Sequence, residues 1–373
     1  MNIFIRLYEK KKKIKENLES KLSEKEKREA LDNEHARRKP IGCGFTIHSG
    51  YGCDNMCLYC YIQDMGLEFT KVRKNPLNGK QMLYALVSNP YIVPERTFLA
   101  FGSISDPFHP ELKEKTLEYM KELKVLGNPI QFSTKFYISE HEAKILRNVD
   151  RNMSGLVTIV TLKKKKILEP RAPEIEERIE TIKILKKYIK PAIFLRPIIP
   201  GITEDEIEDI VNLAKSLDVP IVFGIFRATE NNLKRLSYYF DISEIKRRLP
   251  VKPKGRKQVN LEMNDIILKA IKIVQKYDVR YFIRASCHNA WAHKVVNPAL
   301  EFLKGGCVKC ENNCPEKIPY ISKEEIEEFL EYLNLKAEVE VRPWKIVIKG
   351  RVPLWVKEWV QSIAYKQTLI IKA

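Results

Sequence analysis

The sequence predicts an α/β fold, in which repeated βα units build a parallel β-sheet within a chain of 373 residues. Three observations lead to this prediction. Short apolar segments alternate with helical patterns from Phe45 onward, which is typical of βα repeats. Cysteines follow the first apolar segment, where the carboxyl end of a parallel strand would place a site. The two ends of the chain differ in character, so we expect a charged N-terminal helix and a small C-terminal α+β unit beside the sheet.

The N-terminal segment, residues 1–40, is expected to form one long charged helix over residues 1–38, which Pro40 ends. Ile14, Leu18 and Leu22 recur every four residues and give this helix a thin apolar stripe. Two interpretations are open. The helix is either an arm that packs on the rest of the chain or touches an anionic substrate, or a solvated helix.

Six strands are predicted in the sheet, and helices separate them. The expected strands are Phe45–His48, Thr97–Phe101, Ile130–Ser133, Leu156–Val160, Ala192–Leu195 and Ile221–Phe226. The expected helices include Pro110–Leu123, Glu140–Arg147, Glu174–Tyr188 and Glu204–Leu217. Because the carboxyl ends of parallel strands meet at one edge, the loops that follow these strands are expected to share a site.

The pattern changes after residue 226. A helix over Asn260–Tyr277 and a strand over Val279–Ala285 are expected to complete a domain of residues 41–285, which a second cysteine region follows at residues 286–320. The C-terminal unit, residues 321–373, is expected to contain two helices and three strands. In chain order these elements are Lys323–Leu333, Ala337–Val341, Trp344–Lys349, Pro353–Ala364 and Thr368–Lys372.

Three cysteines carry the strongest chemical signal in the chain. Cys53, Cys57 and Cys60 stand at C-x3-C-x2-C, with the aromatic Tyr59 just before the last. Three thiolates can hold three irons of a [4Fe–4S] cluster and leave the fourth iron without a protein ligand. Zinc sites usually combine two C-x2-C pairs, which this single loop does not offer. The motif therefore predicts an iron–sulfur cluster with one open iron, where a small molecule can chelate.

This motif resembles that of the radical S-adenosylmethionine (SAM) superfamily. Further segments resemble the spore photoproduct lyase-like branch of that superfamily, in matching order over roughly residues 42–226. They are Ser105-Asp106-Pro107, Ser133-Thr134-Lys135-Phe136, Thr158-Ile159-Val160-Thr161, Leu168-Glu169-Pro170-Arg171-Ala172-Pro173 and Arg196-Pro197-Ile198-Ile199-Pro200-Gly201-Ile202-Thr203. The resemblance implies a partial (β/α)6 parallel barrel. It also implies an enzyme that reductively cleaves SAM to a 5′-deoxyadenosyl radical, which abstracts hydrogen from a substrate.

The resemblance implies a role for each matching residue. Cys53, Cys57 and Cys60 would ligate the cluster, and Tyr59 would lie near the adenine or shield the cluster. Lys135 would pair with the SAM carboxylate, since a lysine at a strand end is a compact cation. The other SAM contacts would be Ser103, Ser105 and Asp106 for the methionine amino group, Thr158 for the carboxylate or ribose, and Arg196 for the nucleoside.

One departure limits what the resemblance carries. Spore photoproduct lyase has a hydrogen-donating cysteine just before its Ser-Asp pair, whereas Ser103 and Ile104 precede Ser105 and Asp106 in this chain. The DNA-repair activity is therefore not carried over. His109, shortly after that segment, is expected either to contact substrate or to cap local structure.

A second cysteine group predicts another metal. Cys287, Cys307, Cys310 and Cys314 form C-x19-C-x2-C-x3-C. Four thiolates can hold a second [4Fe–4S] cluster, a single iron or a structural zinc. Cys287 is distant in sequence from the others, so His288 or His293 is an alternative fourth ligand. The group serves either as an auxiliary cluster or as a structural metal site.

The chain is basic, with a formal net charge of +18. This favours an anionic partner such as nucleic acid or an anionic membrane surface, although a densely charged thermophilic surface gives the same composition. Three basic runs could face such a partner: the N-terminal arm, Lys163–Lys166 and Lys234–Lys257. Stacking surfaces for unpaired bases could come from Trp291, Trp344, Trp355 and Trp359, or these could be core residues.

Cysteine usage and hydropathy indicate a compartment. Eight cysteines in a chain of this length do not make a secreted disulfide framework, and we expect metal-bound thiolates in a reducing cytoplasm. No apolar run approaches the roughly 18–20 residues of a membrane span. The expected partners are SAM, an external one-electron reductant and, as one candidate, nucleic acid.

Three functions remain open at this stage. The first is a radical SAM enzyme that modifies an anionic substrate, with nucleic acid favoured by the charge. The second is a radical SAM enzyme that modifies a protein, a peptide or a small metabolite, with an auxiliary cluster. The third belongs to another class and is a non-catalytic iron–sulfur protein that binds partners or transfers electrons.

Overall fold

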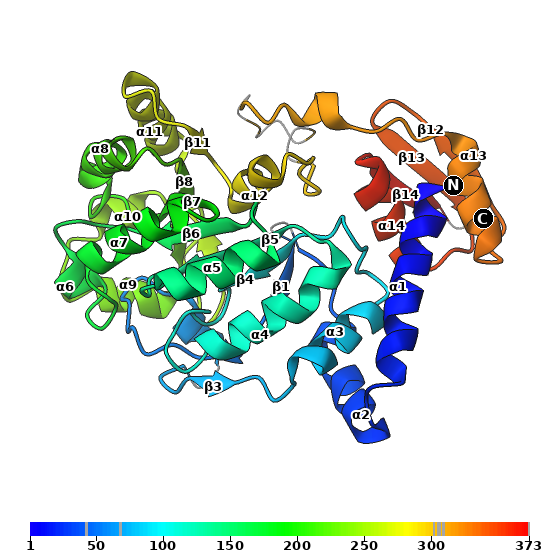
Figure 1. Cartoon of the computed structure of the whole chain (residues 1–373). Coiled ribbons are helices and arrows are strands. Elements are labelled where there is room, and N and C mark those ends of the chain that lie inside the picture. Colours follow the sequence, from blue (N-terminus) through cyan, green and yellow to red (C-terminus); the bar gives the residue numbers. More distant parts are fainter. Residues whose placement is uncertain (42–43, 67–68, 301–302, 304–306, 308–309, 372–373) are drawn as a thin grey trace.

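The computed structural model describes residues 1–41, 44–66, 69–300, 303, 307 and 310–371 (Figure 1). Its centre is a seven-stranded sheet in the order β1-β4-β5-β6-β7-β8-β11, in which every neighbouring pair is parallel. The strands are β1 (Phe45–Ile47), β4 (Leu99–Phe101), β5 (Ile130–Thr134), β6 (Ser154–Thr158), β7 (Lys190–Ile198), β8 (Ile221–Ile225) and β11 (Tyr281–Phe282). The predicted parallel α/β sheet is confirmed. The edge strands of this sheet are β1 and β11, which do not pair with each other, as in a partial barrel.

Helices connect successive strands, so each crossover is a βα unit. Two of them, α4 and α5, lie in front of the sheet in Figure 1. The helices of this part are α3 (Gly79–Ser88), α4 (Lys113–Leu123), α5 (Glu140–Val149), α6 (Lys165–Leu168), α7 (Ile175–Lys186), α8 (Ile207–Leu217), α9 (Glu230–Ser237), α10 (Ser243–Arg247), α11 (Asn264–Lys276) and α12 (Ala285–His293). Two short antiparallel pairs accompany them, β2 (Gly50–Tyr51) with β3 (Arg73–Lys74) and β9 (Arg227–Ala228) with β10 (Val259–Asn260).

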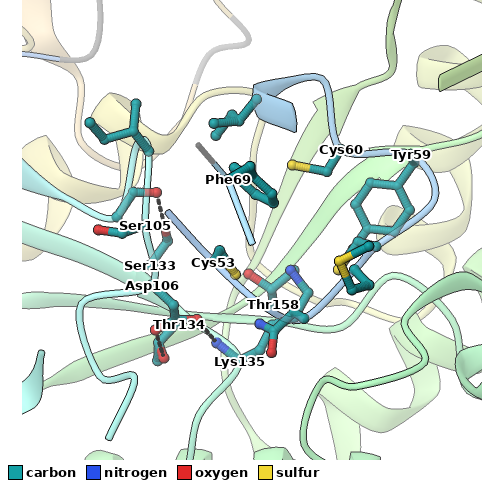
Figure 2. Close-up of a pocket in the computed structure, with 16 residues that line it drawn as sticks. Cys53, Tyr59, Cys60, Phe69, Ser105, Asp106, Ser133, Thr134, Lys135 and Thr158 are labelled. Carbon is teal, nitrogen blue, oxygen red and sulfur yellow. Dashed lines mark hydrogen bonds between the residues drawn. The ribbon is translucent and has the colours of Figure 1, made fainter. Parts of the chain in front are cut away.

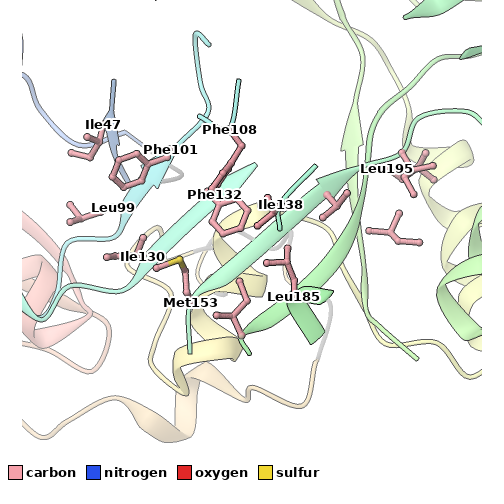
Figure 3. Close-up of a cluster of buried hydrophobic side chains, with 14 of the residues drawn as sticks. Ile47, Leu99, Phe101, Phe108, Ile130, Phe132, Ile138, Met153, Leu185 and Leu195 are labelled. Atoms are coloured by element: carbon pink, nitrogen blue, oxygen red, sulfur yellow. The ribbon is translucent and has the colours of Figure 1, made fainter. Parts of the chain in front are cut away.

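The sheet has one apolar face and one face that carries polar groups. Ile130 and Phe132 of β5 are buried in the cluster of Figure 3, where the ring of Phe132 lies 4.9 Å from that of Phe108. Successive side chains of a strand point to opposite faces. Gln131 and Ser133 therefore point to the other face, where they line a cavity. The alternation within β5 separates the core from the candidate site.

The prediction of one helix over residues 1–38 is wrong. The segment forms α1 (Ile3–Glu19) and α2 (Glu24–Asp32), with a break between them. Ser23 ends the break because its hydroxyl accepts the amide N–H of Glu26, while the Glu26 carboxylate accepts the amide N–H of Ser23. This reciprocal capping starts a new helix. Both helices are packed, since Phe4, Leu7 and Leu18 of α1 and Ala30 of α2 are buried.

The C-terminal unit shares its core with α1. It contains α13 (Lys323–Tyr332), β12 (Ala337–Val341), β13 (Lys345–Gly350), α14 (Leu354–Ala364) and β14 (Gln367–Ile371), with β13 in the middle of its sheet. Phe4 stacks on Phe329 at a centroid distance of 5.4 Å, and both belong to one buried cluster with Trp359. Lys372, the predicted end of the last strand, lies outside the described residues. Within the described part of the chain, no helix is long and apolar enough to span a membrane.

Candidate active site

The three predicted cluster cysteines lie together in a loop that follows β1 and β2. Cys53, Cys57 and Cys60 line one cavity with residues from the carboxyl ends of β4, β5 and β6 (Figure 2). A neighbouring cavity of about 280 Å³ shares Tyr59, Cys60 and other residues with it. The placement follows from the topology, because loops after parallel strands meet at one edge of the sheet.

Burial controls the chemistry of these thiols. It raises the pKa of Cys53 to about 12 and also raises the pKa values of Cys57 and Cys60. The ammonium of Lys135 works in the opposite direction on all three. A buried thiol becomes a thiolate only when a cation offsets the loss of water, so this loop suits a metal centre.

A clamp from α9 holds the cysteine loop in place. Arg235 donates to the carbonyl oxygens of Leu58 (3.1 Å) and Cys60 (2.7 Å) and pairs with buried Asp64 at 2.9 Å. The hydroxyl of Thr229 donates to the same Asp64 carboxylate. The sequence analysis placed Arg235 in a basic run facing the substrate and missed this role. A carboxylate near the cysteines and an arginine beyond the sixth strand were the available signals, but their pairing is visible only in three dimensions.

The Ser-Asp segment after β4 is anchored by hydrogen bonds. Asp106 accepts from the hydroxyl of Thr134 at 2.6 Å and from the amide N–H of Lys135 at 2.8 Å. Ser105 donates to the carbonyl oxygen of Gly50 at 2.9 Å. Both Ser105 and Asp106 line the cavity with the cysteines, while Ser103 lines the neighbouring one. The three predicted amino-group contacts are therefore close to the cysteine loop.

Lys135 belongs to a buried ionic network. Its ammonium lies 3.8 Å from Glu169, which pairs with Arg178 at 2.5 Å, and the side chains of Glu169 and Arg178 are 0% exposed. The hydroxyl of Tyr59 also donates to Glu169. Burial by itself raises the pKa of Glu169, but Arg178 and Lys135 outweigh it and hold that pKa below its usual value.

Glu169 and Arg178 are functional-site residues that the sequence analysis did not identify. The sequence analysis named Glu169 only within the segment Leu168–Pro173 that resembles the spore photoproduct lyase-like branch, and gave it no role. The network fixes Lys135 and Tyr59 on the cavity wall, since Glu169 contacts both. The remaining predicted contacts, Thr158 and Arg196, lie on β6 and β7 and line the larger cavity. All of the predicted SAM contacts are thus brought to one edge of the sheet.

A second network reaches the larger cavity from the N-terminal segment. His48 contacts Glu34 through Nδ1 at 2.7 Å and the hydroxyl of Ser103 through Nε2 at 3.1 Å. His35 accepts the amide N–H of His48 through Nε2 at 3.0 Å. Glu34, His35 and His48 have ligand atoms within 4.8 Å of one another, as a metal site would require. Hydrogen bonds, however, already occupy the ring nitrogens of both histidines. The network therefore orients Ser103 and was not visible in the sequence.

The basic run Lys163–Lys166, which the sequence analysis considered as a contact for an anionic substrate, forms ion pairs. Lys163 pairs with Asp209 at 2.6 Å, and Lys164 pairs with buried Glu206 at 3.0 Å. Lys165 is also paired, with Glu174. His109 contacts Asp54 at 3.1 Å and so supports the cysteine loop. Much of the charge near the site is therefore locally neutralised.

The second cysteine group also comes together. Burial raises the pKa of Cys287 to about 12, and the nearby Cys310, Cys307 and Cys314 add to this rise. The two alternative histidines are hydrogen-bonded to other residues. His288 Nδ1 lies 2.7 Å from the hydroxyl of Ser154, and His293 Nε2 lies 2.6 Å from the carboxylate of Asp150. Cys287, on α12, is thus the fourth member that the structure places near the other thiols.

Comparison with known proteins agrees with this geometry. Residues 47–214 match the family model of the Radical SAM superfamily. The chain carries a radical SAM domain. The resemblance to the radical SAM superfamily that was inferred from the cysteine loop is therefore confirmed.

Solved structures share the fold of this radical SAM domain. A spore photoproduct lyase variant matches with 15% identity and a TM-score of 0.55, covering 64% of this chain and 75% of that one. A variant with bound AdoMet and dinucleoside spore photoproduct matches with 14% identity and a TM-score of 0.54, over the same shares. The uncharacterized protein ORF301 of Acidianus two-tailed virus is 26% identical over 210 residues, which are 50% of this chain and 68% of that protein.

Proposed function

We propose that this protein binds a [4Fe–4S] cluster through Cys53, Cys57 and Cys60, and SAM beside it. With one electron from an external reductant, these groups supply methionine and a 5′-deoxyadenosyl radical, which takes a hydrogen atom from the substrate. One observation carries the proposal. The three thiols, Lys135 and the polar strand ends line two adjoining cavities at the carboxyl edge of the parallel sheet.

The donor atoms fit a cluster better than a single metal ion. Four sulfurs around one zinc lie only ~3.8 Å apart, given Zn–S bonds of about 2.3 Å. Among the described residues, the group of three ligand atoms that all lie within 4.8 Å of one another is Glu34, His35 and His48, and no three cysteine sulfurs form such a group. A larger inorganic core spans a wider separation and takes soft thiolate ligands.

The chain's own residues would orient SAM. Lys135, 16% exposed and fixed by Glu169, would pair with the methionine carboxylate. Ser105 and Asp106 would accept from the methionine ammonium, because both line the cavity with the cysteines. Thr158 and Arg196 would contact the nucleoside from the larger cavity. The walls would also exclude water from the reacting atoms.

An anionic substrate, with nucleic acid as the first candidate, is the substrate class that we propose. The larger cavity is lined by the cations Lys135, Arg196 and Arg227, and no carboxylate stands among its described lining residues. The formal net charge of +18 acts in the same direction. A base inside a duplex would have to leave the stack to reach this cavity, so single-stranded substrate is favoured.

Cys287, Cys307, Cys310 and Cys314 would hold a second [4Fe–4S] cluster. Their mutual effect on the pKa of Cys287 supports a shared site. Such a cluster favours, as a second candidate function, modification of a protein, a peptide or a small metabolite that binds at the auxiliary cluster.

The test is anaerobic reconstitution with iron and sulfide, followed by SAM and dithionite. Formation of 5′-deoxyadenosine is measured by mass spectrometry, with and without total RNA or denatured DNA. We expect product from the natural chain, stimulation by nucleic acid, and no product from Cys57→Ala. As the matched variant, Lys135→Ala should retain iron but bind SAM more weakly.

Each outcome separates the functions. Turnover by Cys57→Ala would contradict the cluster assignment. A fully loaded cluster that forms no 5′-deoxyadenosine would favour the non-catalytic electron-transfer role. If peptides stimulate the formation of 5′-deoxyadenosine and nucleic acid does not, the second candidate function is favoured.

A further inference from the structure

A further cavity, away from the cysteine loop, lies where α1 and α3 meet the C-terminal unit. It has a volume of about 450 Å³ and is lined by Tyr8, Lys11, Lys12, Lys15, Val87, Ser88, Pro90, Trp355 and Trp359. This volume is within the ~300–1,000 Å³ that is usual for ligand sites. The cavity combines aromatic rings with lysines, and no carboxylate is among its described lining residues.

The aromatic rings form a wall and a floor. Trp359 is 1% exposed and donates from Nε1 to the carbonyl oxygen of Pro90 at 2.9 Å, so its position is fixed. Trp355 is half-buried and stacks on Tyr8 with an interplanar angle of 22° and a centroid distance of 6.3 Å. A partly exposed indole supported by a second ring offers a face on which a flat aromatic group can stack.

The lysines differ in what they can bind. Lys11 is buried, donates to the carbonyl oxygens of Asn89 (2.5 Å) and Ile92 (2.7 Å), and lies over the Trp359 ring. Burial lowers the pKa of Lys11 to about 7, so it is a weak source of positive charge. Lys12 is exposed and, among the described residues, has no ion-pair partner. Lys15 pairs with Glu19 at 3.9 Å, and both side chains are about two-fifths exposed.

The geometry points to a binding site for single-stranded nucleic acid, in which an unpaired base stacks on Trp355 and flanking phosphates contact Lys12 and Lys15. Aromatic faces together with accessible cations are the features that bind unpaired strands without strong sequence preference. Lys163–Lys165 pair with carboxylates, whereas Lys12, which lines the cavity, has no such pair among the described residues. This site deepens the proposed function, since it would hold a nucleic-acid substrate at a second point.

Binding is measured on the full chain, anaerobically reconstituted, by fluorescence anisotropy of a labelled 12-nucleotide RNA and of DNA of the same sequence, over a range of salt concentrations. Trp355→Leu should weaken binding by about fivefold or more, the lower end of the loss for one stacked base. Its control is Trp344→Leu, since Trp344 is 51% exposed on the same unit and does not line the cavity. Lys12→Glu should reduce the slope of log affinity against log salt concentration by about one, the value for one phosphate contact. Lys13→Glu is its control, with the same change of charge on the same helix.

A crosslink protects the test against a variant that folds poorly. RNA containing 4-thiouridine is irradiated with the natural chain, and the crosslinked peptide is mapped. We expect it within residues 1–20 or 351–360. Crosslinks confined to other segments, equal losses in Lys12→Glu and Lys13→Glu, binding of free nucleotide but not of the strand, or binding of anionic vesicles instead of RNA would each overturn the inference.

The outcome is separable from that of the proposed function. Binding that depends on Trp355, without stimulation of 5′-deoxyadenosine formation, would support this site and contradict a nucleic-acid substrate. Stimulation by RNA that binds Trp355→Leu and the natural chain equally would overturn this site and leave the substrate proposal standing.

Discussion

Replacing Glu169 by glutamine should destabilise the protein by about 3 kcal/mol, because it leaves a buried guanidinium without its anion. The side chains of Glu169 and Arg178 are both 0% exposed and lie 2.5 Å apart, so water does not screen the loss. Breaking such a pair costs about 3–5 kcal/mol. The lower value is expected, since Arg178 keeps its hydrogen bonds to the carbonyl oxygens of Pro173 (2.8 Å) and Thr158 (3.1 Å).

Anaerobic urea unfolding of the iron-loaded protein, followed by circular dichroism, measures this free energy. The double variant Glu169→Leu/Arg178→Met is the informative control. It removes both charges, so most of the lost stability should return, because apolar pairs often replace buried ion pairs at little cost. The reasoning is refuted if Glu169→Gln unfolds within about 0.5 kcal/mol of the natural chain, which is the scale of an ordinary surface substitution, or if the double variant is as unstable as the single one.

Three further predictions concern the loop, the N-terminal helix and the second metal. Arg235→Ala should speed loss of the cluster absorbance in air, because it releases the carbonyl oxygens of Leu58 and Cys60, whereas Arg247→Ala, which removes only an exposed pair, should not. Arg6 and Lys10 hold the pKa of Glu95 at about 2, below the ordinary 4.5. The stabilisation is therefore present above pH 4.5 and is lost as the pH falls towards 2. Because Arg6 is 37% exposed and Glu95 29% exposed, we expect a stability difference of only ~1 kcal/mol between the natural chain and Glu95→Gln at pH 7, and thermal unfolding from pH 7 to pH 2 should show it vanish. Cys310→Ser should lower the bound iron from about eight to about four atoms per chain, and unchanged iron would contradict a second cluster.

The fold and the cluster loop were predictable because both are written in local patterns. Short apolar runs between helical patterns, such as the run that forms β5 at Ile130–Thr134, mark the strands of the sheet. The spacing of Cys53, Cys57 and Cys60 places three thiols on one loop, and the order of the elements brings that loop to the strand ends. Neither inference needs a partner that is distant in the sequence.

The parts that could not be predicted depend on such distant partners. Arg178 meets Glu169 on one side and Arg235 meets Asp64 on another, and neither spacing suggests a contact. The break in the N-terminal helix was different, because Ser23 and Glu26 are a readable capping pair that the apolar stripe over Ile14, Leu18 and Leu22 obscured. A period of four residues can continue across a short break, so periodicity alone does not show that a helix is continuous.

The distribution of charge narrows the substrate class further than the net value does. The lysines after the fourth strand sit among carboxylates, so they add to the formal charge of +18 but little to the field at the cavity. Two cavities are lined by cations without a carboxylate among their described lining residues, the larger cavity with Arg196 and Arg227 and the α1 cavity with Lys12. A partner that contacts both must be long, anionic and able to present single bases. A strand of nucleic acid meets those three conditions, whereas a small metabolite meets only the second.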